Sequence, residues 1–390
     1  MRGRSSHPPT GGRGARRCGR PPFCGFRLGA LNGVTGRGSS EHAREEELRC
    51  PRGGDFRAAA SSGIVITARA TQNVSRFDLD FRWSQQGIRQ VLVNGTAASF
   101  AREGVQELVV TPAAGLVQGR TFTVTVAYAG TPLVITDPDR SIEGWVPTDD
   151  GAFVVNEPQG SPGCYPVKDN PRDKATFDFR VTVPEGLTAM ANGKLMSNDT
   201  SGGKTTWVWR ETHPMAPYLA TTTLGKFDLS TSMTNGIPTY VAVDPQLAKG
   251  QVLSKLPEVV EFYSSLYGPY PFNAVGAIVD SAKVVGYSLE TQTKPSFPYV
   301  PNEATLVHEL AHMWYGDSVT LTTWPDMWLH EGFATWPSGS GASGRETSPP
   351  TSGSSSSTTP RRRTRASGVP PLRPSPIRLC SSTAPCTTAA

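Results

Sequence analysis

Residues 308–336 read HELAHMWYGDSVTLTTWPDMWLHEGFATW, and the interpretation of the whole chain starts from this stretch. It opens with an HExxH motif, in which His308 and His312 are four residues apart. Apolar residues at helical spacing predict a helix over residues 302–315, and positions i and i+4 of a helix share one face. Both imidazoles can therefore reach one metal ion. The bare motif also occurs by chance, as a helix with two structural histidines.

A third candidate ligand follows in the same stretch. Glu331 comes after His312 with 18 residues between them, inside the segment WLHEGFA. Pro325 can occupy the first position of a further helix, where its missing N–H costs nothing, and that helix would carry Glu331. Three protein ligands and one water complete the coordination of a catalytic zinc ion. Glu309 would then lie beside the water as its general base.

The combined pattern resembles the zinc segment of the aminopeptidase N family, a gluzincin group that also includes leukotriene hydrolase. The family pattern is HExxH, 18 residues and then Glu in an EGFA-type segment. The resemblance implies that His308, His312 and Glu331 bind one Zn²⁺ ion and that Glu309 is the catalytic base. A thermolysin-like endopeptidase would also supply a late Glu, although in a different local context.

Residues 285–291, VGYSLET, resemble the family's GAMEN exopeptidase segment in a variant form. The resemblance implies that Glu290 holds the free α-amino group of the substrate. It also implies that the substrate backbone lies along the four preceding residues, Gly286, Tyr287, Ser288 and Leu289. The alternative is an ordinary turn with one exposed carboxylate.

A second carboxylate for the amino group is expected in the N-terminal half. Glu157, followed by Cys164 and Asp169, resembles the family segment that reaches across to the substrate from the first domain. Two carboxylates against one ammonium would select peptides with a free N-terminus, because charge-assisted contacts in a closed pocket are strong. Taken alone, Glu157 would be a solvated surface residue.

The fold class follows from periodicity and from the resemblance. Alternating apolar and polar residues, with turn residues between the runs, predict a series of short strands, among them 77–81, 91–93, 122–128, 176–183 and 207–209. We expect an all-β saddle or sandwich domain over residues 61–228. Helical spacing over 253–267 predicts a helix, and the resemblance implies a thermolysin-like α+β catalytic domain over 229–336, incomplete relative to the family. Trp314, Trp324 and Trp328 are expected in its core.

The two flanks have a different composition. Residues 1–60 and 337–390 are rich in Arg, Gly, Ser and Pro, carry net charges of +7 and +6, and are expected to be disordered. The middle of the chain carries −8, so the net charge of +5 does not indicate a nucleic-acid partner. Because the flanks hold no Lys or Trp, we take an out-of-frame GC-rich gene as a hypothesis for the tail.

Localisation and assembly are not indicated by the sequence. No run of about 18 apolar residues predicts a transmembrane segment, and the basic N-terminus has no apolar signal-peptide core. A cytoplasmic or a secreted protein fits equally, and the oligomeric state stays open.

Two functional hypotheses remain. The first is an aminopeptidase that releases N-terminal residues from peptides by attack of a zinc-bound water. The second is a truncated or frameshifted family member that binds zinc with little or no activity. The second is motivated by the family's catalytic Tyr, which has no counterpart after Glu331 because the last tyrosine in the chain is Tyr315. Zinc content together with turnover of an aminoacyl anilide separates the two.

Overall fold

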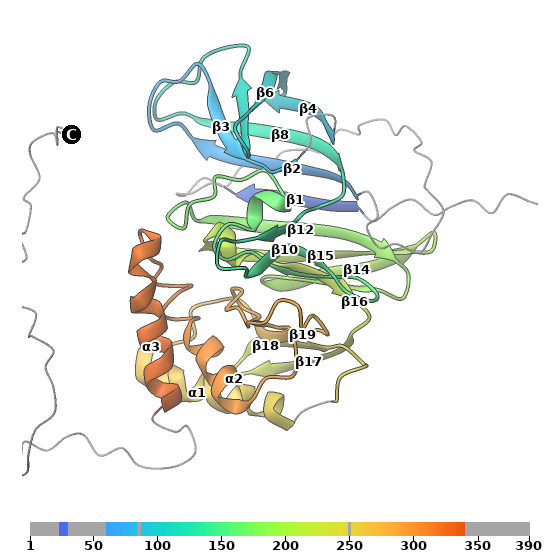
Figure 1. Cartoon of the computed structure of the whole chain (residues 1–390), viewed down its shortest axis with the longest axis vertical. Helices are drawn as coiled ribbons and strands as arrows, with labels where there is room; N and C mark the ends of the chain where they lie inside the picture. The colour runs from blue at the N-terminus through green and yellow to red at the C-terminus, as the bar shows by residue number, and fades with distance from the viewer. Residues whose placement is uncertain (1–22, 30–59, 84–86, 249–250, 340–390) are drawn as a thin grey trace, which may run out of the picture. The chain divides into compact units, whose positions relative to one another are not determined.

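The computed structural model describes residues 23–29, 60–83, 87–248 and 251–339. Strands make up most of the first two thirds of the chain, and the helices follow them near the C-terminal end of this part (Figure 1). The expected order, an all-β part followed by an α+β part, is confirmed. Among the described residues, no helix is long and apolar enough to cross a bilayer.

Eight strands form the largest sheet. They are β1 (Phe23–Gly29), β2 (Ala60–Arg69), β4 (Ile88–Val93), β5 (Thr96–Ala97), β8 (Thr121–Gly130), β12 (Ala175–Pro184), β14 (Lys194–Ser201) and β15 (Lys204–Met215). Their order is β14-β15-β12-β1-β2-β8-β4-β5. In β12 the residues Phe177, Phe179, Val181 and Val183 are buried while their neighbours are more exposed, which is the period-2 pattern of a half-buried strand. The strands expected at 122–128, 176–183 and 207–209 are therefore confirmed.

Strand β1 corrects the expectation that residues 1–60 are disordered. It pairs in parallel with β2 and antiparallel with β12, so that Phe26 lies opposite both Ile64 and Phe179. Its sequence, FCGFRLG, has three large apolar residues and no proline, which suits a strand. The Arg- and Gly-rich composition of the flank masked this short run. The rest of 1–59 lies outside the described residues.

Two smaller sheets complete the all-β part. One has three strands in the order β3-β7-β6, namely β3 (Phe77–Asp80), β7 (Glu107–Thr111) and β6 (Ser99–Glu103). The other has five in the order β13-β16-β11-β10-β9, namely β13 (Thr188–Ala191), β16 (Thr222–Gly225), β11 (Ala152–Val155), β10 (Ile142–Pro147) and β9 (Val134–Thr136).

The turn between β4 and β5 follows from its sequence. Asn94 and Gly95 both have positive φ, 51° and 77°, and Val93 pairs with Thr96. Two central residues with positive φ make a type I′ turn, for which Asn-Gly is the preferred pair. The strand expected at 91–93 and its hairpin turn are confirmed.

The α+β part begins with a four-stranded sheet. Its strands are β17 (Asp228–Thr234), β18 (Ile237–Val243), β19 (Val275–Val279) and β20 (Ser296–Phe297), in that order. β18, β19 and β20 are parallel, and α1 (Leu256–Tyr267) lies in the crossover between β18 and β19. Every residue of β19 is buried, as expected of a parallel strand covered on both faces.

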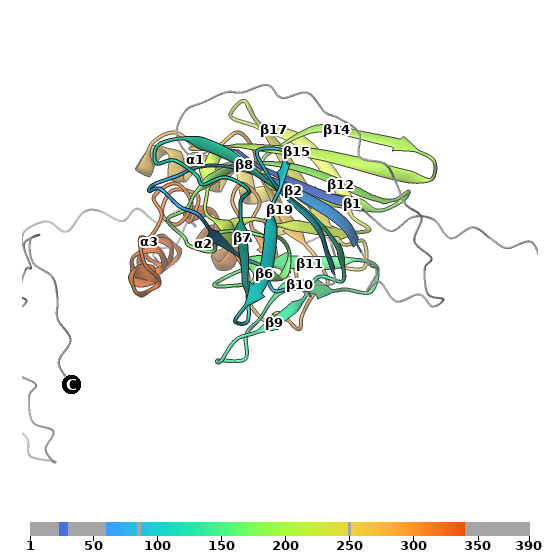
Figure 2. The same ribbon diagram turned by 90° about the horizontal axis from the view of Figure 1, so that it is seen from above.

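Two further helices follow the sheet, α2 (Glu303–Ala311) and α3 (Met327–Gly339). They pack against each other and lie side by side in both views (Figures 1 and 2). Short 3₁₀ turns occupy Ser161–Gly163, Pro217–Leu219, Gln251–Lys255 and Trp324–Asp326. α2 ends earlier than the predicted 302–315, because the chain turns after His312 and Asp317 N–H bonds the His312 carbonyl. α3 reaches into the expected tail 337–390, of which residues 340–390 lie outside the described part.

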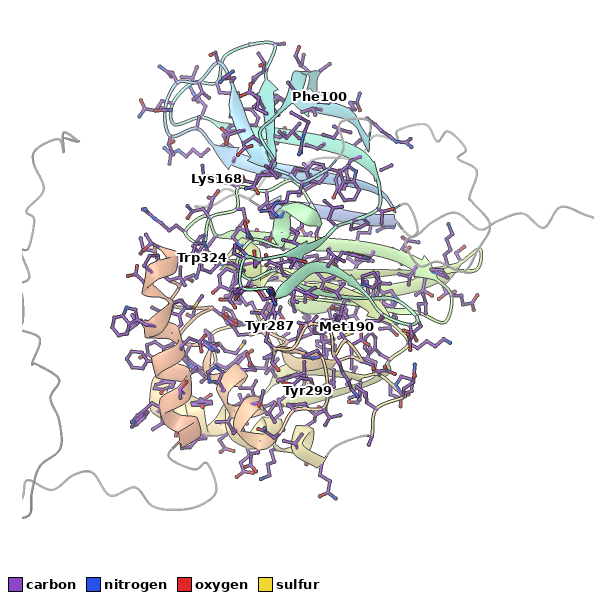
Figure 3. All side chains as sticks on the ribbon, in the orientation of Figure 1. Phe100, Lys168, Met190, Tyr287, Tyr299 and Trp324 are labelled. Carbon is purple, nitrogen blue, oxygen red and sulfur yellow. The ribbon has the colours of Figure 1, made fainter. Side chains whose placement is uncertain are left out.

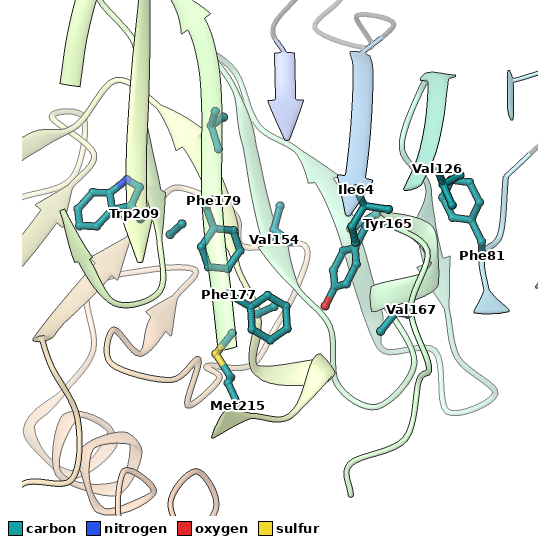
Figure 4. Close-up of a cluster of buried hydrophobic side chains, with 14 of the residues drawn as sticks. Ile64, Phe81, Val126, Val154, Tyr165, Val167, Phe177, Phe179, Trp209 and Met215 are labelled. Carbon is teal, nitrogen blue, oxygen red and sulfur yellow. The ribbon is translucent and has the colours of Figure 1, made fainter. Parts of the chain in front are cut away.

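The hydrophobic cores explain how the two parts are joined. The large core of the all-β part contains Trp209, Phe177 and Phe179 (Figure 4), and it also takes in Tyr240 and Ile278 of the α+β part. A second core lies between the four-stranded sheet and the helices. The two parts therefore share buried apolar surface, which is the main favourable term in folding.

The three tryptophans expected in the catalytic core differ from one another. Trp314 is 6% exposed and belongs to the second core. Trp324 is partly buried against the core of the all-β part, beside Tyr218. Trp328 is 70% exposed, so its assignment to the core was wrong. Apolar residues are so frequent in this stretch that their spacing does not predict which face of α3 is exposed to solvent.

Candidate metal and amino-group site

Helix α2 is fixed at its start and along one face. The Asn302 side chain caps it by accepting a hydrogen bond from Thr305 N–H at 2.8 Å. Leu306, Val307 and Leu310 are buried in the second core. Packing of this apolar face leaves the other face of the helix for the histidines of the HExxH motif.

The two histidines converge on one point. The Nε2 atoms of His308 and His312 are 3.1 Å apart. His312 Nδ1 lies 3.0 Å from the Tyr315 carbonyl oxygen, which assigns the Nδ1 proton to that bond and leaves the Nε2 lone pair free. A hydrogen bond of this kind fixes the ring orientation of metal-binding histidines. The arrangement suits two Nε2 ligands of one ion.

Helix α3 adds the third side chain. Glu331 Oε2 is 3.2 Å from His308 Nε2, and Oε1 is 3.8 Å from His312 Nε2. The hydrogen bond with His308 lowers the pKa of Glu331, so the carboxylate form is favoured. Ligand atoms about 2.0–2.2 Å from a tetrahedral zinc ion lie about 3.3 Å from each other. The two pairs that include His308, at 3.1 and 3.2 Å, fit this spacing, and the pair of Glu331 and His312, at 3.8 Å, is slightly wider.

Glu309 lies on the buried side of this group. One carboxylate oxygen of Glu309 lies within 4.8 Å of a carboxylate oxygen of Glu290 and of a ring nitrogen of His312, and these two atoms also lie within 4.8 Å of each other. Burial, together with the charges of Glu290 and Glu331, raises the pKa of Glu309 well above its usual value. A carboxyl with a raised pKa beside a cation site is suited to accept and return a proton.

Glu290 is buried rather than exposed on a turn. Its side chain is 3% exposed, and its Oε1 atom has no hydrogen-bond partner. A buried carboxylate oxygen without a partner is costly unless a cation or donor binds it. The alternative interpretation, an ordinary turn with one exposed carboxylate, is wrong for this residue.

The four residues before Glu290 form the edge of the site. Tyr287 joins the two parts, because its hydroxyl donates to the Ile142 carbonyl of β10 at 3.3 Å (Figure 3). Leu289 is fully buried and pairs with Ser296 through two backbone bonds of 3.0 and 2.8 Å. Gly286 has φ +82°, and Ser288 has a buried hydroxyl without a partner. The backbone bonds of Leu289 hold one end of the segment along which a substrate strand is expected.

Glu157 follows β11 and approaches the same carboxylates. Burial raises its pKa well above the usual value, and the charge of Glu290 is the next largest cause, followed by those of Glu331 and Glu309. Glu157 is only partly buried, so it is not the freely solvated residue of the alternative interpretation. The charges of Glu157, Glu290, Glu309 and Glu331 are therefore close enough to act on one another beside the two histidines.

Two family models match this chain. The family model described as "Peptidase M1 N-terminal domain" matches residues 64–219, and that described as "Peptidase family M1 domain" matches residues 289–362. The chain belongs to peptidase family M1. The resemblance to aminopeptidase N is thereby confirmed.

Individual M1 proteins extend this likeness. Aminopeptidase M1 of Arabidopsis thaliana is 33% identical over 207 residues, 48% of this chain and 23% of that protein. Probable aminopeptidase 2 of Sulfurisphaera tokodaii is 30% identical over 194 residues, 44% of this chain and 24% of that protein. The matched part spans about a quarter of the length of these curated relatives.

Solved structures cover more of the chain. The M1 zinc metallopeptidase from Deinococcus radiodurans has 27% identity and a TM-score of 0.67, covering 82% of this chain and 70% of its own. A mutant of that M1 protein, bound to a Tyr-Ser-Ala substrate, has 26% identity and a TM-score of 0.66, covering 81% and 69%.

Sequence reasoning missed two buried polar residues of this M1 site. The Tyr218 hydroxyl has no hydrogen-bond partner; burial raises its pKa well above the usual value, and the charges of Glu290 and Glu157 add to this. Both carboxylate oxygens of Asp317 are likewise buried without partners. Asp317 follows the HExxH motif closely enough to be suspected from sequence. Tyr218 is distant in sequence and had no such signal.

Proposed function

We propose that this chain is a zinc-dependent aminopeptidase that removes N-terminal residues from peptides. The observation that carries the proposal is the convergence of His308, His312 and Glu331 beside three further carboxylates, Glu157, Glu290 and Glu309. The first three would hold one Zn²⁺ ion. Residues 61–228 would form the β-rich domain and 229–336 the catalytic domain.

Membership of family M1 supports this assignment. The curated relatives are named aminopeptidases, and the structural neighbours are zinc metallopeptidases, one of them bound to a Tyr-Ser-Ala substrate. We extend zinc binding and a peptide substrate with a free N-terminus to this chain as part of the proposal. The donor set of two imidazoles and one carboxylate fits zinc by its own chemistry.

The three carboxylates beside the proposed ligands have two tasks in the proposed reaction. Glu290 and Glu157 hold the substrate ammonium, which offsets the cost of keeping Glu290 buried and Glu157 partly buried. The backbone of residues 286–289 aligns the peptide. Zinc in such a site lowers the pKa of water toward about 7 and favours the ionised form of nearby acids. Glu309 accepts the proton of the attacking water and passes it to the leaving amine.

The selection of N-termini follows from charge and space. The ammonium of the first residue would neutralise the buried Oε1 of Glu290, whereas an acetylated N-terminus would leave that oxygen without a donor cation. Leaving a buried charged group unpaired costs at least about 1.4–2.8 kcal/mol, or about 10- to 100-fold in binding. An endopeptidase would not show this dependence.

The test combines metal content with two substrates. We expect about one zinc per chain, turnover of a free aminoacyl anilide and no turnover of its N-acetyl form. Equal cleavage of both anilides would refute the exopeptidase assignment. Zinc binding without turnover would instead favour the alternative of a family member with little or no activity.

A further inference from the structure

The loop that carries Glu290 is a hairpin whose tip enters the all-β part. Leu289 and Ser296 close its base through their paired backbone bonds. Inside the loop, Lys294 N–H bonds the Thr291 carbonyl, and the Thr291 hydroxyl donates to the Lys294 carbonyl at 2.6 Å. The tip therefore keeps one conformation, and Glu290 lies between the base and the tip.

The tip is bonded to residues about 100 positions earlier in the chain. Asn192 donates its side-chain amide to the Gln292 carbonyl at 2.7 Å and to the Leu219 carbonyl at 2.9 Å. Gly193 N–H donates to the Thr293 hydroxyl at 2.8 Å. Thr293 has a φ of +73°, which a β-branched residue adopts only when its surroundings hold it there.

Lys294 carries the charged side chain of the tip. It is fully buried, and its ammonium donates to the carbonyl oxygens of Ala191, at 2.9 Å, and Gly193. The same nitrogen lies 4.5 Å from the ring centre of Trp209 and 5.3 Å from that of Tyr240. Carbonyl oxygens and aromatic faces both stabilise a cation.

Burying the charge of a lysine costs free energy, so its presence at this position needs an explanation from its contacts. Burial lowers the pKa of Lys294 to about 7, because loss of water around the side chain disfavours its charged form. An apolar side chain of the same length would fill the space between the rings without this cost. The bonds of the ammonium to Ala191 and Gly193 are what such a side chain could not supply. They tie the Glu290 hairpin to the turn between β13 and β14.

We infer that Lys294 is a positioning residue: by fixing the tip of the hairpin to the all-β part, it holds the Glu290 carboxylate where it meets the substrate amino group. The inference rests on the proposed aminopeptidase function. It also explains how Glu290 and Glu157, which come from different parts of the chain, stay aligned on one ammonium.

The test compares Lys294→Met with a matched control. Lys283→Met makes the same replacement at an exposed position seven residues before Glu290. For Lys294→Met we expect KM for a free aminoacyl anilide to rise about 10- to 100-fold, the range for loss of a charged contact, with kcat changed much less. Zinc content and both constants of Lys283→Met should match those of the wild type.

A double-mutant comparison separates positioning from general structural damage. In a Glu290→Gln background, Lys294→Met should raise KM little further, because both changes remove the same interaction. Additive effects in the double mutant would overturn the inference. Thr293→Ala, a smaller change that removes the acceptor of Gly193 N–H, should shift KM in the same direction if Lys294→Met fails to fold.

Hydrogen exchange distinguishes failure of the inference from failure of the proposed function. If the wild type shows no turnover, the proposed function fails, and the hairpin is judged by its amides. Peptides covering residues 286–297 should then exchange faster in Lys294→Met, or in Thr293→Ala, than in Lys283→Met. Unchanged exchange in these peptides would overturn the positioning role, whatever the activity.

Discussion

Which residues hold the metal ion can be decided by two conservative substitutions. Among the residues that the structure describes, two groups of side chains could hold a metal ion, and both include His312. One is completed by His308 and Glu331, and the other by Glu290 and Glu309. Glu331→Gln removes a ligand from the first group only, and Glu290→Gln removes one from the second group only.

The expected magnitude follows from the geometry of the first group. Zinc binding to a four-ligand site is worth about 10–16 kcal/mol, or about 2.5–4 kcal/mol for each ligand. Glu331 lies within 3.2 Å of His308 Nε2, but its side chain is 47% exposed, so water can partly replace it. We therefore expect Glu331→Gln to weaken zinc binding by about 100-fold, the lower end of this range.

The control variant should behave differently. Glu290→Gln keeps the two imidazoles and the Glu331 carboxylate, so its zinc affinity should stay within about threefold of the wild type. Zinc affinity is measured by competition with a chelator of known affinity at pH 7.5. Loss of affinity in Glu290→Gln, with Glu331→Gln unaffected, would refute the assignment and place the ion in the buried group.

The remaining predictions concern the base, one buried acid and a helix cap. Glu309→Gln should abolish anilide turnover and leave zinc bound; retained turnover would refute the general-base role. Glu143 has a pKa raised to about 8 by burial and by its hydrogen bond with Asp137. The folded state then binds more protons than the unfolded state between about pH 4.5 and 8, so stability falls as pH rises through this window. Glu143→Gln should flatten that slope in denaturant unfolding, and an unchanged slope would contradict the shift. Asn302→Ala removes the cap of α2 and should cost about 1 kcal/mol in the same assay, whereas no loss would show that the cap is dispensable.

The candidate metal site could be proposed from the sequence because the spacing of its two histidines is local. His308 and His312 lie four residues apart on one helix, so helical geometry alone brings their Nε2 atoms together. Glu331 is more distant in sequence; it was a candidate ligand from its place 18 residues after His312, and the family resemblance gave it that role. Its meeting with His308 depends on the packing of α3 against α2, which no spacing rule provides.

Other features could not be predicted because their partners are remote. The Lys294 ammonium bonds the carbonyl oxygens of Ala191 and Gly193, about 100 residues earlier in the chain. Nothing in the local sequence, a lysine followed by a proline, indicates that this side chain is buried. Strand β1 was missed because its seven residues are stable only when paired with β2 and β12. Trp328 was misplaced because composition does not reveal which face of a helix is covered.

The proposed metal ligands could be transferred to another protein more easily than the proposed selectivity for N-termini. The proposed zinc ligands lie within one continuous segment of 24 residues, from His308 to Glu331. The proposed amino-group clamp would instead need Glu157 from one part of the molecule and Glu290 from the other, with Lys294 tying the Glu290 hairpin to the all-β part. A graft of residues 308–331 onto another scaffold could carry metal binding with it. The same graft would not carry a preference for N-termini, because that preference would depend on Glu157 and Glu290, which lie outside the grafted segment.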